Sequence, residues 1–174
     1  MTERTNTTPD LKTLTGSWTL VASETTVAFT TKAMWIMPVR ASITALEGSA
    51  VIGENGSVSG TLVLDAASID TKNKKRDAHL RTEDFFEVSK FPTFVINVLG
   101  ATPTAAGAYE LAATMTIHGQ ERPKKLPASI SVAGDVATVT VETDIDRSDW
   151  GVTWAKMGAG VQNHVIVSAR FTKD

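Results

Sequence analysis

Arg76, Asp77 and His79 form the densest cluster of residues that could perform chemistry in this sequence. A histidine beside a carboxylate is a common composition for a general acid/base pair. Asp77 and His79 are two positions apart, however, and on a helix that spacing directs the side chains away from each other. The sequence therefore argues against a catalytic dyad. The alternative is that Arg76 and Asp77 tie a connecting segment to the neighbouring strand ends.

Other catalytic and metal-binding patterns find little support. His79, His118 and His164 are isolated from one another, and no HExxH or Cys/His spacing is present. The chain has no cysteine, which excludes thiolate chemistry and disulfides. No glycine string follows a strand and opens a helix, and no Gly-x-Ser-x-Gly elbow singles out a serine. We expect neither a metal nor a cofactor, and we expect His118 and His164 to be exposed to solvent.

The composition indicates one folded domain of 174 residues, long enough to bury a core without crosslinks. Its 17 basic and 19 acidic residues give a formal net charge of -2, which offers no electrostatic case for binding nucleic acid or an anionic membrane. The N-terminal segment is polar, and no segment has the apolar length of a membrane span. We therefore expect a soluble, cytoplasmic protein with a flexible arm at residues 1–13 and a single domain at residues 14–174.

The stretch from residue 71 to residue 94 interrupts a sequence that otherwise reads as strands. Residues 74–80 lack Gly, Pro and β-branched side chains, which favours a short helix. Thr82 is placed to cap a second turn beginning at Glu83, and Pro92 ends the connection. Its apolar residues predict a helical plug across one end of a closed sheet: Leu80, Phe85, Phe86 and Phe91.

Alternation of apolar and polar residues predicts antiparallel strands elsewhere, as in residues 39–45, where Val39, Ala41, Ile43 and Ala45 share one face. The pattern recurs around residues 58–64, 94–98, 109–117, 126–132, 139–145 and 165–171. We interpret the runs 17–22 and 26–31 as one bent strand, which gives about eight strands, enough to close a barrel. Residues 34–38 are predicted as a loop and residues 100–107 as a turn.

The barrel is predicted to have an apolar interior, since Ser, Thr, Lys, Arg and Glu occupy the alternate positions, whereas a membrane barrel carries its apolar face outward. Small side chains at inward positions would leave unfilled volume inside such a barrel, so we expect a cavity. These small residues are Ala41, Ala45, Gly60, Ala113, Ala128 and Ala169.

Three strings of this chain resemble the YceI-like family of bacterial lipocalin-like proteins. The most specific lies in residues 69–94 and contains IDT, RD, HL, FF and FPTF; MTIHG at residues 115–119 and IDRSDWG at residues 145–151 also match. The resemblance covers most of the chain from about Gly16 onward. Two positions depart from the family, namely Ala33, where a histidine usually follows the lysine, and Ala41, which replaces a common glycine.

The resemblance implies an all-β, eight-stranded antiparallel lipocalin-like barrel whose tunnel holds a polyisoprenoid, such as an isoprenoid quinone tail, or another long-chain amphiphile. It implies transport, storage or sequestration without a chemical step, so we expect no enzyme. Two alternatives remain open: an enzyme acting on a bound lipid with His79 or His164 as its base, and a filled barrel with a stress-related or interaction role. An open apolar mouth is also compatible with a homodimer that covers it.

Two loops rich in Trp and Met are predicted to form the mouth of the tunnel, with the plug closing the opposite end. The alternative for both loops is ordinary packing over a barrel end. The candidate mouth residues are Met34, Trp35, Met37, Trp150, Trp154 and Met157. The candidate strand residues, most of which are expected to be core, are Ile43, Phe94, Leu111, Met115 and Phe171.

Overall fold

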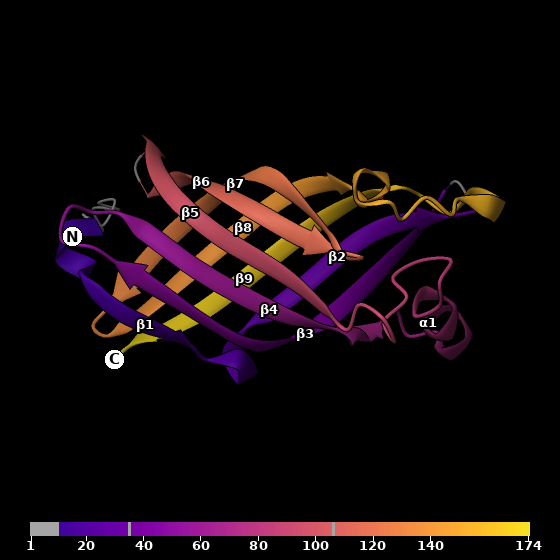
Figure 1. Ribbon diagram of the computed structural model, residues 1–174, viewed down its shortest axis with the longest axis horizontal. Coiled ribbons are helices and arrows are strands. Elements are labelled where there is room, and N and C mark those ends of the chain that lie inside the picture. The colour runs from indigo at the N-terminus through magenta and orange to yellow at the C-terminus, as the bar shows by residue number, and fades with distance from the viewer. Residues whose placement is uncertain (1–10, 35, 106) are drawn as a thin grey trace, which may run out of the picture.

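In a computed structural model, the chain folds into one closed antiparallel sheet (Figure 1). The structure describes residues 11–34, 36–105 and 107–174. The strands are β1 (Gly16–Leu20), β2 (Thr26–Ala33), β3 (Met37–Ile52), β4 (Val58–Asp70), β5 (Thr93–Ala105), β6 (Ala108–Ile117), β7 (Gln120–Ala133), β8 (Val136–Asp146) and β9 (Gln162–Lys173). The helical elements are α1 (Lys74–Leu80) and the 3-10 helices η1 (Leu11–Leu14), η2 (Ala22–Glu24), η3 (Arg147–Trp150) and η4 (Lys156–Gly158).

The sheet closes as an eight-stranded barrel, as the sequence predicted. Its strand order is β1-β3-β2-β9-β8-β7-β6-β5-β4. The sheet closes because β3 also pairs with β4, the last strand in this order. Both β1 and β2 pair with β3 on one side and with β9 on the other. The two therefore occupy one strand position, which the 3-10 turn η2 interrupts.

Two segments predicted to be irregular belong to strands instead. Met37 and Pro38 pair with β2 as the first residues of β3, where the missing N–H of a proline is tolerated at a strand end. The expected turn at residues 100–107 is mostly strand, because β5 runs to Ala105. The register with β6 shifts between Val98 and Gly100 and again between Pro103 and Ala105. Pairing of β5 with β6 continues on either side of these irregularities.

Helix α1 has the predicted bounds, and Asn73 caps its N-terminus by accepting a hydrogen bond from the Arg76 N–H at 3.0 Å. A turn begins at Glu83, as predicted, with the Phe85 N–H donating to the Thr82 carbonyl at 3.0 Å, but the Thr82 side chain does not cap it. Thr82 instead donates its hydroxyl to the His79 carbonyl at 2.6 Å, and residues 82–91 follow as turns. Because the hydroxyl closes the end of α1, it is unavailable as the cap of a new helix.

The cluster at the start of α1 ties the helix to the end of β4, as the sequence predicted. Buried Asp77 accepts hydrogen bonds through Oδ1 from the Thr71 N–H at 2.9 Å and the Thr71 hydroxyl at 2.5 Å. Arg76 donates to the Thr71 hydroxyl at 2.8 Å and to its carbonyl at 3.0 Å. Asp77 and His79 do not contact each other in this arrangement.

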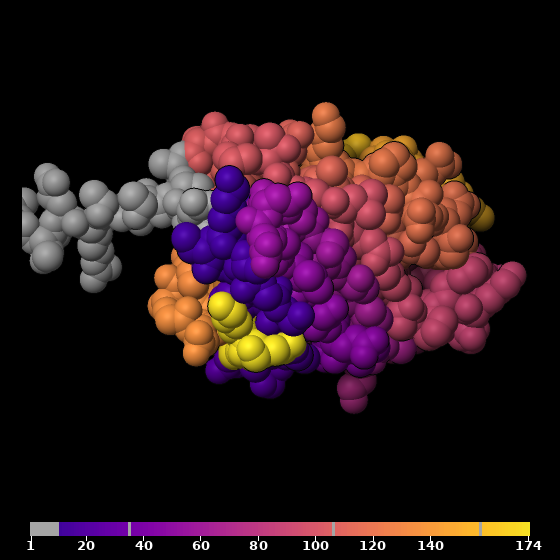
Figure 2. All heavy atoms as spheres, turned by 60° about the vertical axis from the view of Figure 1, so that its left-hand side comes forward, coloured from indigo at the N-terminus to yellow at the C-terminus, as the bar shows by residue number. Residues whose placement is uncertain are grey.

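The end of the barrel opposite α1 is covered by η1 and β1. Leu11 and Trp18 are buried there, and the Trp18 indole donates to the Leu14 carbonyl at 2.9 Å. Figure 2 shows the atoms of this N-terminal segment beside those of the C-terminus over this end. Residues 1–10 lie outside the described residues, and the division of the chain between an arm and a domain near residue 14 stays a prediction.

Candidate ligand-binding tunnel

The described residues line three adjoining cavities in the barrel and at its end, which we call the far, middle and mouth chambers. Their volumes are about 170, 80 and 540 Å³. The far and middle chambers share lining residues that include Val27 and Met115, and the middle and mouth chambers share Phe29, Phe86 and Arg147. The chambers therefore follow one another along the barrel, and together they form the candidate tunnel.

Strand β8 runs along the whole tunnel, because its alternate residues point inward. Ala137, Val139, Val141, Thr143 and Ile145 line the far chamber, and the next residue in phase, Arg147, lines the middle and mouth chambers. Ten residues of strand span about 33 Å. At a strand tilt of about 40° this corresponds to a tunnel of about 25 Å along the barrel axis.

The far chamber is apolar, and its described lining includes no charged residue. Ser49, Thr61 and Thr143 contribute its hydroxyl groups. Leu11, Leu14 and Trp18 line this chamber, so the elements that cover the far end also bound it. Such a surface offers a ligand burial and shape, with few directed polar contacts.

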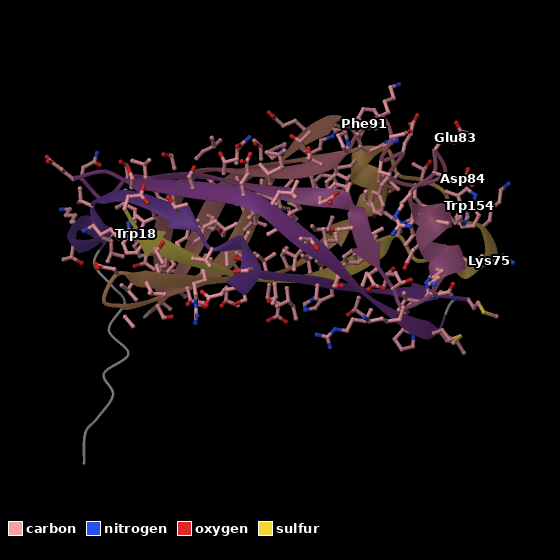
Figure 3. All side chains as sticks on the ribbon, turned by 90° about the horizontal axis from the view of Figure 1, so that it is seen from below. Trp18, Lys75, Glu83, Asp84, Phe91 and Trp154 are labelled. Atoms are coloured by element: carbon pink, nitrogen blue, oxygen red, sulfur yellow. The ribbon has the colours of Figure 1, made fainter. Side chains whose placement is uncertain are left out.

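The mouth chamber lies between α1, the turns that follow it, and the loop before β9. The Trp154 ring packs edge-on against His79, with centroids 4.6 Å apart, and in a tilted arrangement against Phe85 at 5.0 Å. His79 Nε2 lies 2.8 Å from Asp84 Oδ2. In Figure 3, Trp154 and Lys75 lie together at the end of the barrel opposite Trp18. The expectation that the plug closes the end away from the Trp and Met loops is therefore wrong. Successive strands of this antiparallel barrel alternate in direction, so the connections after β2, β4 and β8 lie at the same end.

Arg147 holds the loop that borders the mouth chamber. This buried guanidinium donates to the carbonyls of Val152 at 2.8 Å, Trp154 at 2.6 Å and Gly160 at 3.0 Å. Its Cζ also lies 5.1 Å from the Phe85 ring centroid. Burial lowers the pKa of Arg147, and the nearby charge of Asp146 partly opposes that shift.

Arg147 was not among the predicted site residues, although its position in the sequence indicates that it is buried. The inward alternation of β8 ends at Ile145, and one more step in the same phase falls on Arg147. An arginine at the inward phase of an apolar strand is unusual enough to mark a buried charge.

The predicted ligand-binding residues are only partly brought together. Leu111, Met115 and Phe171 line the far chamber, Ile43 and Phe94 line the middle chamber, and Met34 and Trp154 line the mouth chamber. Met37 is 57% exposed and does not line a chamber. Trp150 is buried in the core and donates its indole N–H to the Met115 carbonyl at 2.9 Å. Trp35 and the Met157 side chain lie outside the described part of the chain. Ligand binding by any of these residues stays a prediction.

The other two histidines differ from each other in their surroundings. The His118 side chain is 19% exposed and packs against Phe91 with ring centroids 4.9 Å apart, so the prediction of a solvated residue is wrong there. His164 is 42% exposed and lies 2.7 Å from both Asp144 and Glu142. Hydrogen bonds to these two carboxylates raise the pKa of His164.

Within the described residues, no group of three or more His, Cys, Asp or Glu side chains is arranged to hold a metal ion. No helix in the described ranges reaches the length and apolarity that a membrane-spanning helix requires.

The fold is a lipocalin-like barrel, because its antiparallel sheet is closed, its interior is apolar and a chamber lies at one end. A family model described as the YceI-like domain matches residues 18–172. The chain therefore belongs to the YceI-like family, which confirms the resemblance seen in its three strings.

Solved structures share this fold at low sequence identity. *Burkholderia cenocepacia* BcnA aligns with a TM-score of 0.76 and 16% identity, covering 87% of this chain and 98% of that chain. A polyisoprenoid binding domain from *Saccharophagus degradans*, implicated in plant cell wall breakdown, aligns with a TM-score of 0.69 and 14% identity, covering 90% and 98% of the two chains.

Curated relatives match a shorter region. A UPF0312 protein of *Vibrio cholerae* is 31% identical over 71 residues, which are 41% of this chain and 38% of the relative. A UPF0312 protein of *Ectopseudomonas mendocina* is 31% identical over 68 residues, or 39% and 36% of the two chains. The match thus spans less than two-fifths of the length of these relatives.

Proposed function

We propose that this protein binds the apolar tail of a polyisoprenoid, or of a similar long-chain amphiphile, in its tunnel, and transports, stores or sequesters it unchanged. The observation that carries the proposal is the row of adjoining chambers with an apolar far end. The similarity in fold to a polyisoprenoid binding domain supports it. A quinone tail as one candidate ligand, a cytoplasmic location and a homodimer belong to the same proposal, whereas a stress-related role without a ligand belongs to the alternative of a filled barrel.

The energetics of burial are sufficient for such a ligand. A tail of four isoprene units has twenty carbons, and about 0.8 kcal/mol for each buried carbon gives roughly 16 kcal/mol gross. Ordering the tail and losing its translational freedom removes a large part of this gain. The middle chamber is the smallest of the three, and Phe86 is one of the side chains that line it.

Binding of isoprenoid alcohols of different length tests the proposal. Delipidated protein is titrated with geranylgeraniol, of twenty carbons, and with geraniol, of ten, and complexes are counted by native mass spectrometry. Ala137→Phe places a ring in the far chamber, whereas Ala112→Phe, at an exposed position on β6, is the matched control.

We expect the native protein and the control to bind one geranylgeraniol, and Ala137→Phe to lose it while still binding geraniol. Absence of binding by the native protein, or equal binding by all three proteins, would show that the tunnel does not hold the tail. An enzyme would instead use His79, whose ring pairs with Asp84 at the mouth, and conversion of the added lipid in this assay would favour it.

A further inference from the structure

The mouth chamber concentrates positive charge. Five cationic side chains line it, from four separate segments of the chain, and no carboxylate occurs among its described lining residues. The cations are Lys32 of β2, Lys75 and Arg76 of α1, Arg147 of η3 and Lys156 of η4. The whole chain carries a formal net charge of -2, so this local excess runs against the overall balance.

Three carboxylates near these cations in sequence have other hydrogen-bond partners. Asp77 accepts two hydrogen bonds from Thr71, and Asp84 pairs with His79. Asp146 accepts hydrogen bonds from Ser148 and from the Gln162 side chain. Within the described part of the chain, the lysines of the chamber form no ion pair. Asp146 offsets part of the charge of Arg147, whereas the three lysines leave an excess of positive charge at the chamber.

Arg147 is the most informative of the five, because it is 6% exposed and its described hydrogen-bond partners are neutral carbonyls. A buried guanidinium without a carboxylate partner is costly. It lines both the mouth and middle chambers, where a tail lying in the barrel would meet its head group. Arg76 also lines the mouth chamber; its Nε and Nη2 donate to Thr71, and its Nη1 makes no hydrogen bond to the described residues.

We propose that the mouth chamber selects an anionic head group, so that the ligand is an amphiphile with a carboxylate or phosphate at one end and an apolar tail in the barrel. This inference rests on the proposed function and names its ligand class. A carboxylate or phosphate oxygen can accept charge-assisted hydrogen bonds from guanidinium and ammonium groups, which an alcohol or a quinone cannot match. The exposed lysines draw the head group in, Arg76 donates to it through Nη1, and Arg147 contributes its charge next to the tunnel while its donors hold the loop.

Two pairs of probes with matched tails test the proposal: oleic acid beside oleyl alcohol, and farnesyl phosphate beside farnesol. Dissociation constants are measured below the micelle concentration at low and high salt. The test variant carries Lys32→Gln, Lys75→Gln and Lys156→Gln. The matched control carries Lys74→Gln, Lys90→Gln and Lys173→Gln, which change the net charge equally at exposed positions that do not line the chamber.

The proposal predicts that at least one anionic probe binds about tenfold or more tightly than its alcohol. This ratio should fall in the test variant and with salt, but not in the control variant. The pair with the larger ratio identifies the head group as a carboxylate or a phosphate.

Equal binding of the acids and alcohols would overturn the anionic head group and leave the tail-binding function standing. Equal loss of the ratio in both variants would overturn it as well, because net charge alone would then explain the preference. If no probe binds, both the inference and the proposed function fail.

Discussion

Replacing Arg147 by methionine tests whether one buried guanidinium holds the loop beside the mouth. The variant keeps an apolar stem of similar length and removes the donors to Val152, Trp154 and Gly160. Hydrogen bonds from a charged group contribute about 1.5–3 kcal/mol each, or roughly 5–9 kcal/mol gross for three. The variant also avoids several kcal/mol of desolvation that the buried charge costs. We therefore expect the free energy of unfolding to fall by about 2–4 kcal/mol.

Urea unfolding gives this free energy, and amide hydrogen exchange reports where the loss occurs. Exchange should accelerate at residues 152–160 more than in the β8–β9 ladder. Arg122→Met, at an exposed position on β7, is the control and should change the free energy by less than about 0.5 kcal/mol. An Arg147→Met variant as stable as the native protein would refute the reasoning, because desolvation would then equal or outweigh the three hydrogen bonds.

Three further predictions concern stability. The raised pKa of His164 means that its protonated form stabilises the fold below its unfolded pKa of about 6.5, and that this contribution disappears as pH rises through the folded value. Unfolding in urea at pH 6 and pH 8.5 should thus show a larger loss for His164→Gln at pH 6; an equal loss would contradict the ion pairs. Asp77→Ala leaves a buried N–H and hydroxyl unpaired and should cost about 2–3 kcal/mol in the same assay, whereas no loss would mean that water replaces the carboxylate. Gly119→Ala should lower the melting temperature more than Gly134→Ala, since both have positive φ but an added Cβ meets the Phe91 ring only at Gly119; equal shifts would show that the ring gives way.

The strands and α1 could be predicted because their signals are local. The period-two alternation of residues 39–45 sets which face is buried whatever the partner strand is. A run without breakers at residues 74–80 favours helix in any context, and both predictions were confirmed. Pro38 and Gly100 were misread because local propensity marks them as irregular, whereas pairing with β2 and β6 extends the strands through them.

The arrangement of the tunnel could be predicted less well, because it depends on contacts between distant segments. Trp154 meets His79 across 75 positions of sequence, and no local pattern predicts this contact. The shared end of the plug and the mouth follows from the alternating direction of the strands from β2 to β9. The burial of Arg147 also requires the loop that folds back over it. Its inward phase on β8 is visible in the sequence, but its partners, the carbonyls of residues 152–160, are backbone groups that side-chain patterns do not identify.

The most direct test of the central claim is organic extraction of the natively purified protein, followed by mass spectrometry of the extract. Ala112→Phe and Ala137→Phe are purified and extracted in parallel. We expect about one long-chain amphiphile per chain from the native protein and from Ala112→Phe, and much less from Ala137→Phe. An empty extract from native protein that also fails to take up added amphiphiles would contradict the account, because the barrel would then be a closed structure without a ligand.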